Sequence, residues 1–205
     1  AVSASGALID GDHIMAIAAV DLAHRGLLRN KGVAVTVMTN LGFHHTMRDN
    51  NIDVVITPVG DRSILVALDE FDFVLGGEQS GHVIHRAHAT TGDGLLAALQ
   101  LVEYITRARV TLDQAASIMQ SYPQILVNIR TLNRVHDPVH DIAEQIARAE
   151  AELGDNGRIL VRSSGTEPLV RVMVEAADQV TAESIAIRVA QAVVGIHGGS
   201  IEGTH

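Results

Sequence analysis

Apolar and polar residues follow two different periodicities along the first 120 residues. After Asp10-Gly11-Asp12, apolar residues recur three and four positions apart as far as Leu22, which predicts a helix with an acidic start. The β-branched runs at 33–38 and 53–59 predict buried strands, and a third strand at 73–75 leads into two glycines. Because strands and helices alternate, we expect a parallel sheet with helical crossovers.

The remaining elements are predicted from the same patterns. Further helices are expected at 41–49, 61–70, 95–107 and 112–119, and a short strand at 82–84. Tyr122-Pro123 interrupts the pattern, and we place a domain boundary there. Beyond it we expect strand, helix, strand, strand and helix at 124–131, 138–153, 158–161, 169–175 and 181–194. The predicted fold class is therefore α/β: a parallel-sheet α/β domain over 1–121, a small α+β domain (βαββα) over 122–197, and a Gly-rich, mobile tail over 198–205.

Composition narrows the class of protein. Apolar residues make up 47% of the 205 positions and aromatic residues only 2%, so the core must be aliphatic. A net charge of −9 argues against a nucleic-acid partner. No apolar run reaches the ~18 residues of a membrane span, so no membrane partner is expected. The lack of cysteine excludes disulfides and thiolate metal sites and favours a cytoplasmic setting. The first residues do not form a signal peptide, and the absence of an initial Met indicates a chain that begins inside a longer protein.

A loop at 162–168 has the chemistry of a site for a tetrahedral anion. It joins two predicted strands and offers the Arg162 guanidinium, the hydroxyls of three residues, and backbone amides around a glycine. The residues after the arginine are Ser163, Ser164, Gly165 and Thr166. Arg171 lies on the next predicted strand and is placed to point back to the loop. The alternative is a polar hairpin loop with solvated arginines.

A second loop, Gly76-Gly77-Glu78-Gln79-Ser80-Gly81-His82, follows a predicted parallel strand at the sheet edge where ligands bind. The alternate spacing of Glu78 and Ser80 places a carboxylate and a hydroxyl on one side, which suits vicinal sugar hydroxyls. His82 closes the loop and is a candidate proton carrier, and Asp93 either caps a helix or orients it. The alternative is a Gly-rich turn with a surface acid.

The sequence leaves the role of Arg62 open and argues against a metal site. Arg62, in Gly60-Asp61-Arg62, either brings a cation to the same cleft or lies in solvent behind an Asp61 helix cap. The acidic pair at Asp10 and Asp12 lacks a third ligand and is explained by helix capping, so no metal site is predicted there. The spacing of the histidines also fails to gather them on one face of a strand.

Together, residues 76–82 resemble the sugar-binding loop, and 162–171 the phosphate-binding loop, of the α-D-phosphohexomutase superfamily. The segments at 59–62, 91–94 and 123–128 resemble its phosphoglucosamine mutase branch. The resemblance implies the third and fourth of four domains, with residues 1–9 ending the preceding domain.

The resemblance also implies an activity: interconversion of glucosamine 6-phosphate and glucosamine 1-phosphate through a phosphoserine and Mg²⁺, neither of whose loops is in this chain. Glu78 and Ser80 would hold the sugar, and the 162–166 loop with Arg171 the phosphate that is not transferred. Arg62 and His82 would support catalysis. The expected partners are a phosphosugar and the missing N-terminal domains. The alternatives are a non-catalytic phosphosugar-binding fragment, or a phosphomannomutase or phosphoglucomutase of the same superfamily.

Overall fold

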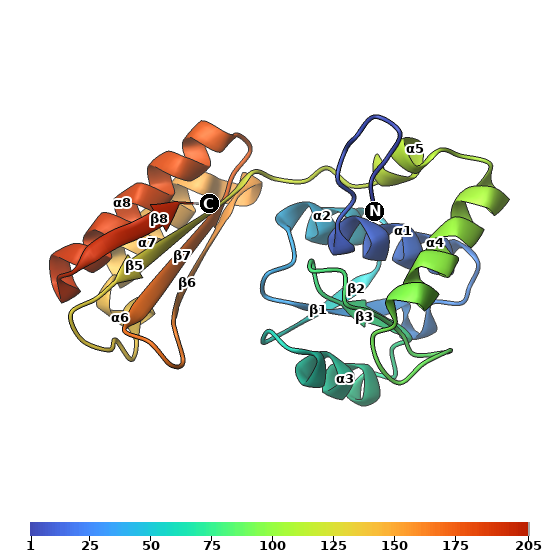
Figure 1. Ribbon diagram of the computed structural model, residues 1–205, viewed down its shortest axis with the longest axis horizontal. Helices are drawn as coiled ribbons and strands as arrows, with labels where there is room; N and C mark the ends of the chain where they lie inside the picture. The colour runs from blue at the N-terminus through green and yellow to red at the C-terminus, as the bar shows by residue number, and fades with distance from the viewer. Residues whose placement is uncertain (205) are drawn as a thin grey trace. The chain divides into compact units, whose positions relative to one another are not determined.

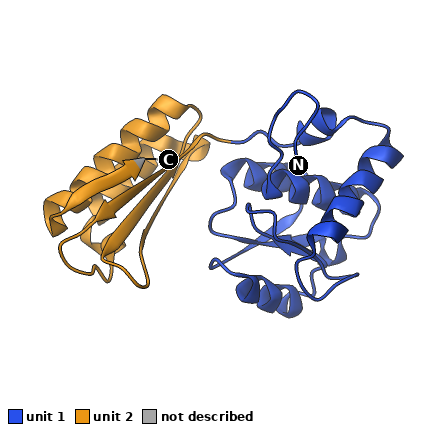
Figure 2. Ribbon diagram, in the orientation of Figure 1, with its two compact units in different colours: residues 1–121 blue, residues 122–205 orange. Residues whose placement is uncertain are grey.

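A computed structural model describes residues 1–204 and divides the chain into two compact units, residues 1–121 and the remainder from Tyr122 onward (Figure 2). No helix within residues 1–204 is both long enough and apolar enough to span a membrane.

The first unit is a four-stranded sheet, in the order β2-β1-β3-β4, covered by helices. Its strands are β1 (Gly32–Thr36), β2 (Asp53–Thr57), β3 (Leu75–Gly77) and β4 (Val83–His85). Its helices are α1 (Gly11–His24), α2 (Leu41–Asp49), α3 (Asp61–Glu70), α4 (Gly94–Ala108) and α5 (Leu112–Ala116), with a 3-10 turn η1 (Arg29–Lys31). In Figure 1, α3 lies on one side of the sheet, and α1 and α2 lie on the other.

The expectation of a parallel sheet is right for β1, β2 and β3 and wrong for β4, which runs antiparallel to β3. Only residues 78–82 join β3 to β4, which is too short for the helical crossover that a parallel pair needs. The chain therefore turns back as a hairpin, and Gly81 adopts a φ of +95° in the turn.

Alternation along β1 explains how one short strand builds two cores. Val33 and Val35 pack with α1 and α2, whereas Ala34, between them, packs with α3. Both cores are largely aliphatic, as the low aromatic content predicts.

The start of α1 positions the polar loops of this unit. Asp10 is the N-cap, and its carboxylate accepts a hydrogen bond from the backbone N of His13 at 3.1 Å, as the capping interpretation predicts. Asp12 is fully buried, and its Oδ2 accepts from the backbone N of Asn40 at 2.8 Å. The two acids therefore serve to fix the helix and the loop after β1.

The second unit is a four-stranded antiparallel sheet in the order β6-β7-β5-β8. Its strands are β5 (Gln124–Arg130), β6 (Arg158–Ser163), β7 (Leu169–Glu175) and β8 (Ser200–Thr204). Its helices are α6 (Pro138–Asp141), α7 (Ala143–Leu153) and α8 (Gln179–His197), with a 3-10 turn η2 (Gly154–Asn156). The single helix expected at 138–153 is thus two, separated at Ile142, which is buried in a non-helical conformation.

The mobile tail expected over 198–205 is wrong for residues 200–204. These form β8, which pairs antiparallel with β5 and adds a strand to the predicted βαββα order. The last predicted residue of the tail, His205, lies outside the described residues.

Within residues 122–204, helices α7 and α8 pack on one face of this second sheet. Val127 of β5 and Val172 of β7 pack with residues of α7 and α8 in the aliphatic core. Side chains at the intervening positions, among them Asn128, Arg162 and Arg171, point to the opposite face, which we call the outer face.

Candidate functional site

The β3–β4 turn, residues 78–82, is held by its own backbone and by the first turn of α1. Within the turn, Glu78 N donates to His82 O at 3.1 Å, and Gly81 N donates to Glu78 O at 3.0 Å. Gly11 N donates to Gln79 O at 2.9 Å. A Cβ on Gly11 would lie 2.2 Å from Glu78 O, so only glycine allows this approach. The turn is therefore a rigid support for its side chains.

Glu78 and Ser80 line the same hollow, together with Thr36, Met38, Val59 and Gln79. The hollow has a volume of about 310 Å³. One carboxylate oxygen of Glu78, Oε1, accepts from Gly60 N at 3.1 Å, which ties the turn to the loop before α3. Because a carboxylate has several lone pairs, Glu78 can still accept hydrogen bonds from a ligand.

His82 lies between Asp61 and Gly92. Its Nε2 is buried and lies 2.9 Å from Oδ2 of Asp61, a close polar contact that does not have the geometry of a hydrogen bond. A Cβ on Gly92 would lie 2.3 Å from the same nitrogen, so the backbone at Gly92 lies against the ring. Asp93, the other residue considered for orienting His82, is the N-cap of α4 and accepts from Leu96 N at 3.0 Å. Asp61 does not cap α3, whose N-cap is Gly60 without a side-chain hydrogen bond.

Arg62 lines a different hollow from Glu78 and Ser80. Its neighbours there include Pro58, Val66 and Phe71, from β2 and α3. The structure thus brings Glu78 and Ser80 to one hollow and places Arg62 at another. A supporting role of Arg62 in catalysis stays a prediction.

In the second unit, residues 164–168 form the turn between β6 and β7. The turn closes with a bond from Ser164 N to Leu169 O at 2.7 Å, and Ser164 Oγ accepts from Glu167 N at 3.4 Å. Ser163 Oγ donates to Val135 O at 2.7 Å, so its proton is committed to the protein. Arg134, which sequence reasoning missed, donates to Gly165 O and supports the turn from outside.

Arg162 and Arg171 are direct cross-strand neighbours on the outer face. Burial and, secondarily, the positive charge of Arg171 lower the pKa of Arg162 below the usual arginine value. Neither guanidinium has an ion pair with a carboxylate in the described part of the chain. Asn128 faces Arg171 from β5, so two cations and an amide form one row. Such a row with unbalanced positive charge suits an anion with several oxygens.

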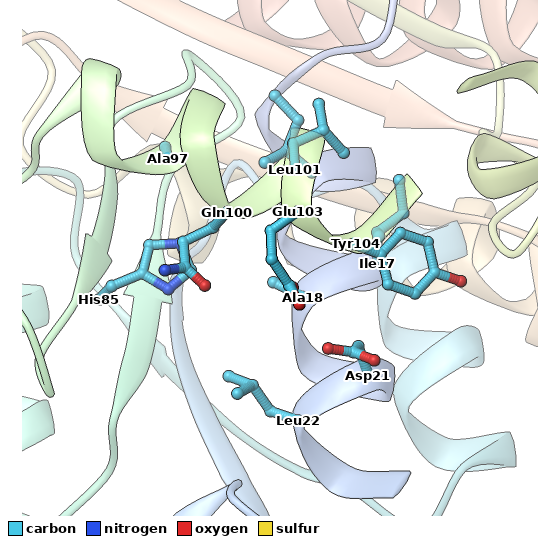
Figure 3. A pocket seen from close by; sticks show the side chains of 11 residues that line it. Ile17, Ala18, Asp21, Leu22, His85, Ala97, Gln100, Leu101, Glu103 and Tyr104 are labelled. Carbon is cyan, nitrogen blue, oxygen red and sulfur yellow. The ribbon is translucent and has the colours of Figure 1, made fainter. Parts of the chain in front are cut away.

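A separate cavity lies between α1, β4 and α4 (Figure 3). His85 lines it, is 5% exposed, and has no hydrogen-bond partner at Nε2. Burial and, secondarily, the charge of His88 lower the pKa of His85. Asp21 and Glu103 also line the cavity, and both pair with Arg107. None of the residues proposed to bind substrate contributes to it.

No group of three histidine, aspartate or glutamate side chains within residues 1–204 is placed to hold a metal ion.

Two models of known protein families match the two units of this chain. Residues 10–122 match the family model for phosphoglucomutase/phosphomannomutase alpha/beta/alpha domain III, and residues 126–192 match that for the C-terminal domain. The chain belongs to the phosphoglucomutase/phosphomannomutase family. The resemblance and the fold class predicted from the sequence are thereby confirmed, with β4 and β8 corrected as described above.

Relatives in this family include the phosphoglucosamine mutases of Clavibacter michiganensis subsp. michiganensis and Frankia alni. The first is 53% identical over 186 residues, which is 89% of this chain, and the second 53% over 194 residues, which is 94%. The chain spans 42% and 43% of the lengths of these relatives.

A solved structure with the same fold is that of Aspergillus fumigatus N-acetylphosphoglucosamine mutase in complex with GlcNAc-6P and magnesium. It matches with a TM-score of 0.74 and 23% identity over 91% of this chain and 44% of that chain. At this identity the likeness shows the fold alone.

Proposed function

We propose that this chain is the substrate-recognition part of a phosphoglucosamine mutase, which interconverts glucosamine 6-phosphate and glucosamine 1-phosphate. The observation that carries the proposal is the row of Arg162 and Arg171 beside the turn at 164–168. Names of relatives at 53% identity support the choice of glucosamine phosphates over other hexose phosphates.

The second unit would bind the phosphate that is not transferred. Two guanidinium groups present several N–H donors to a phosphate dianion, and the dianion offsets their mutual repulsion. Thr166 is exposed on the turn and supplies a further hydroxyl. Ser163, whose hydroxyl donates to Val135 O, would support the turn and not donate to the phosphate. Ser164 and Gly165 would contribute through the shape of the turn.

The first unit would bind the sugar. Glu78 accepts hydrogen bonds from sugar hydroxyls, and Ser80 either donates or accepts, so the pair fits two neighbouring hydroxyls. Binding energy from these groups, which do not react, positions the reacting end of the substrate. His82 would exchange a proton with the reacting oxygen, and Arg62 would act near it as a supporting cation.

The phosphoserine and the Mg²⁺ of the whole enzyme would be supplied by the domains that precede this chain. Phosphoryl transfer then needs both parts, and the isolated chain binds substrate without converting it. The alternatives are a non-catalytic phosphosugar-binding fragment, or a phosphomannomutase or phosphoglucomutase of the same superfamily.

An assay of the whole protein tests the activity. We expect conversion of glucosamine 6-phosphate, and weaker activity with mannose and glucose phosphates. Glu78→Gln should raise KM for the amino sugar, whereas Glu152→Gln, an exposed surface change on α7, should not. A preference for mannose or glucose phosphates would assign another activity within the family, and no conversion of any hexose phosphate would refute the proposal.

A further inference from the structure

The Asp61–His82 contact brings together two residues that lie far apart in the sequence. We propose that Asp61 is a positioning residue that holds His82 with its proton on Nε2, so that Nδ1 is the nitrogen that exchanges a proton with the substrate. This inference rests on the proposed function for the role of His82. The orientation of the ring is a separate matter that the isolated chain can test.

Two loops fix the positions of the pair. Asp61 is the first residue of α3, directly after Gly60 at φ +122°, and His82 directly follows Gly81 at φ +95°. The bond from Gly60 N to Glu78 Oε1, at 3.1 Å, ties these loops together. The carboxylate and the ring therefore meet because the backbone on both sides is fixed, and not through chance pairing of two flexible surface side chains.

The ring is also confined on its other side. A Cβ on Gly92 would lie 2.3 Å from Nε2, 2.4 Å from Cε1 and 2.6 Å from Cδ2 of His82. The backbone of Gly92 thus occupies the space into which this edge of the ring would swing. Asp61 and Gly92 together define one orientation.

The carboxylate determines which nitrogen of His82 carries the proton. An ionised carboxylate only accepts hydrogen bonds, and a neutral imidazole has one donor and one acceptor nitrogen. Nε2 is buried and lies 2.9 Å from Asp61 Oδ2 without the geometry of a hydrogen bond, and the negative charge beside it favours the neutral form with its proton on Nε2 and a lone pair on Nδ1. When a sugar hydroxyl attacks the phosphorus of a phosphomonoester donor, a new P–O bond forms and the P–O bond to the donor breaks, with its electron pair staying on the donor oxygen. The O–H bond of the attacking hydroxyl breaks as well, and its proton moves to Nδ1. The resulting imidazolium faces Asp61, and in the reverse step the proton returns to the oxygen.

Stability alone does not account for the contact. The side chains of His82 and Asp61 are 33% and 51% exposed, and ion pairs that exposed contribute little to folding. Substitution of Asp61 should therefore leave the chain folded, which makes the inference testable.

The test is the tautomer of His82, read from its ring ¹⁵N chemical shifts in the histidine-labelled chain above neutral pH. We expect the Nε2–H form in the natural chain. In Asp61→Asn, whose amide can also donate to Nε2, we expect a several-fold shift of the population toward Nδ1–H. The control is Asp69→Asn on the same helix, where an exposed carboxylate pairs with Arg86, and this variant should leave His82 unchanged. An equal tautomer ratio in the natural chain and Asp61→Asn would overturn the inference.

Activity of the whole protein supplies the second measurement. Asp61→Asn should lower kcat about 10- to 100-fold with little change in KM, and Asp61→Glu should recover part of the loss. If the tautomer shifts but the whole protein converts no phosphosugar, the proposed function fails while the orientation by Asp61 stands. If the protein is a mutase and Asp61→Asn leaves both tautomer and kcat unchanged, the role of Asp61 is refuted.

Discussion

Replacement of Gly11 by alanine tests how the first turn of α1 supports the turn at 78–82. The added Cβ would lie 2.2 Å from Glu78 O, 2.6 Å from Gly81 N and 2.8 Å from Gln79 O. All three are backbone atoms, so no side-chain rotation can relieve the contacts.

The magnitude follows from two opposing effects. Alanine is favoured over glycine inside a helix by up to about 1 kcal/mol. Overpacking at a site that cannot relax costs about 1–3 kcal/mol, and contacts this short belong at the upper end of that range. We therefore expect a net loss of about 1–2 kcal/mol in the stability of this region, which corresponds to an equilibrium constant of opening raised about 5- to 30-fold.

Gly94→Ala is a matched control. Gly94 is also the first residue of a helix behind an aspartate N-cap, but nothing lies within 4 Å of its added Cβ. Hydrogen exchange measured by mass spectrometry reports each segment separately, which suits a chain of two units. Gly11→Ala should speed exchange in the segment 76–85 and leave the second unit unchanged, whereas Gly94→Ala should do neither. Equal protection of 76–85 in the two variants would refute the packing argument.

Three further predictions follow from the structure. Gly92→Ala should displace the ring of His82 without unfolding the chain, because the atoms that meet the added Cβ belong to the His82 side chain, which can rotate away. The expected result is a change in the His82 ring ¹⁵N shifts with an unchanged circular dichroism spectrum. Because the pKa of His85 is lowered in the folded chain, the unfolded chain takes up this proton at a higher pH than the folded chain does. The free energy of unfolding should therefore fall as pH drops below about 6.5, by at most about 1.4 kcal/mol per pH unit, until the folded-state pKa is reached. His85→Gln should reduce this slope in denaturant titrations, and an identical slope in the variant would contradict the argument. Truncation after Gly199 removes β8 and should speed exchange of the β5 amides that face it, while amides of the first unit stay protected.

Much of the fold can be predicted because it depends on local patterns. The β-branched run in β1, the apolar periodicity of α1 and the aspartate caps of α1 and α4 are each readable within a few residues. The polar loops are also recognisable, because Glu78 and Ser80 occur within one short turn.

The remaining features depend on contacts between distant residues. β8 follows two glycines, contains a third and has one apolar residue, Ile201, so its pairing with β5 is what makes it a strand. Likewise, Asp61 is a reasonable helix cap by sequence, and its contact with His82 arises because the loops after β2 and β3 lie at the same end of the sheet. Local patterns carry no information about such neighbours.

The central claim is that this chain recognises a phosphosugar through Arg162 and Arg171. Calorimetric titration of the chain with glucosamine 6-phosphate tests it directly. Each charge-assisted hydrogen bond contributes about 1.5–3 kcal/mol, so Arg171→Ala should weaken binding about 10- to 150-fold. Arg188→Ala, an exposed arginine on α8 that pairs with Glu152, should bind as the natural chain does. Absence of binding by the natural chain, or equal affinity of the Arg171 and Arg188 variants, would contradict the account.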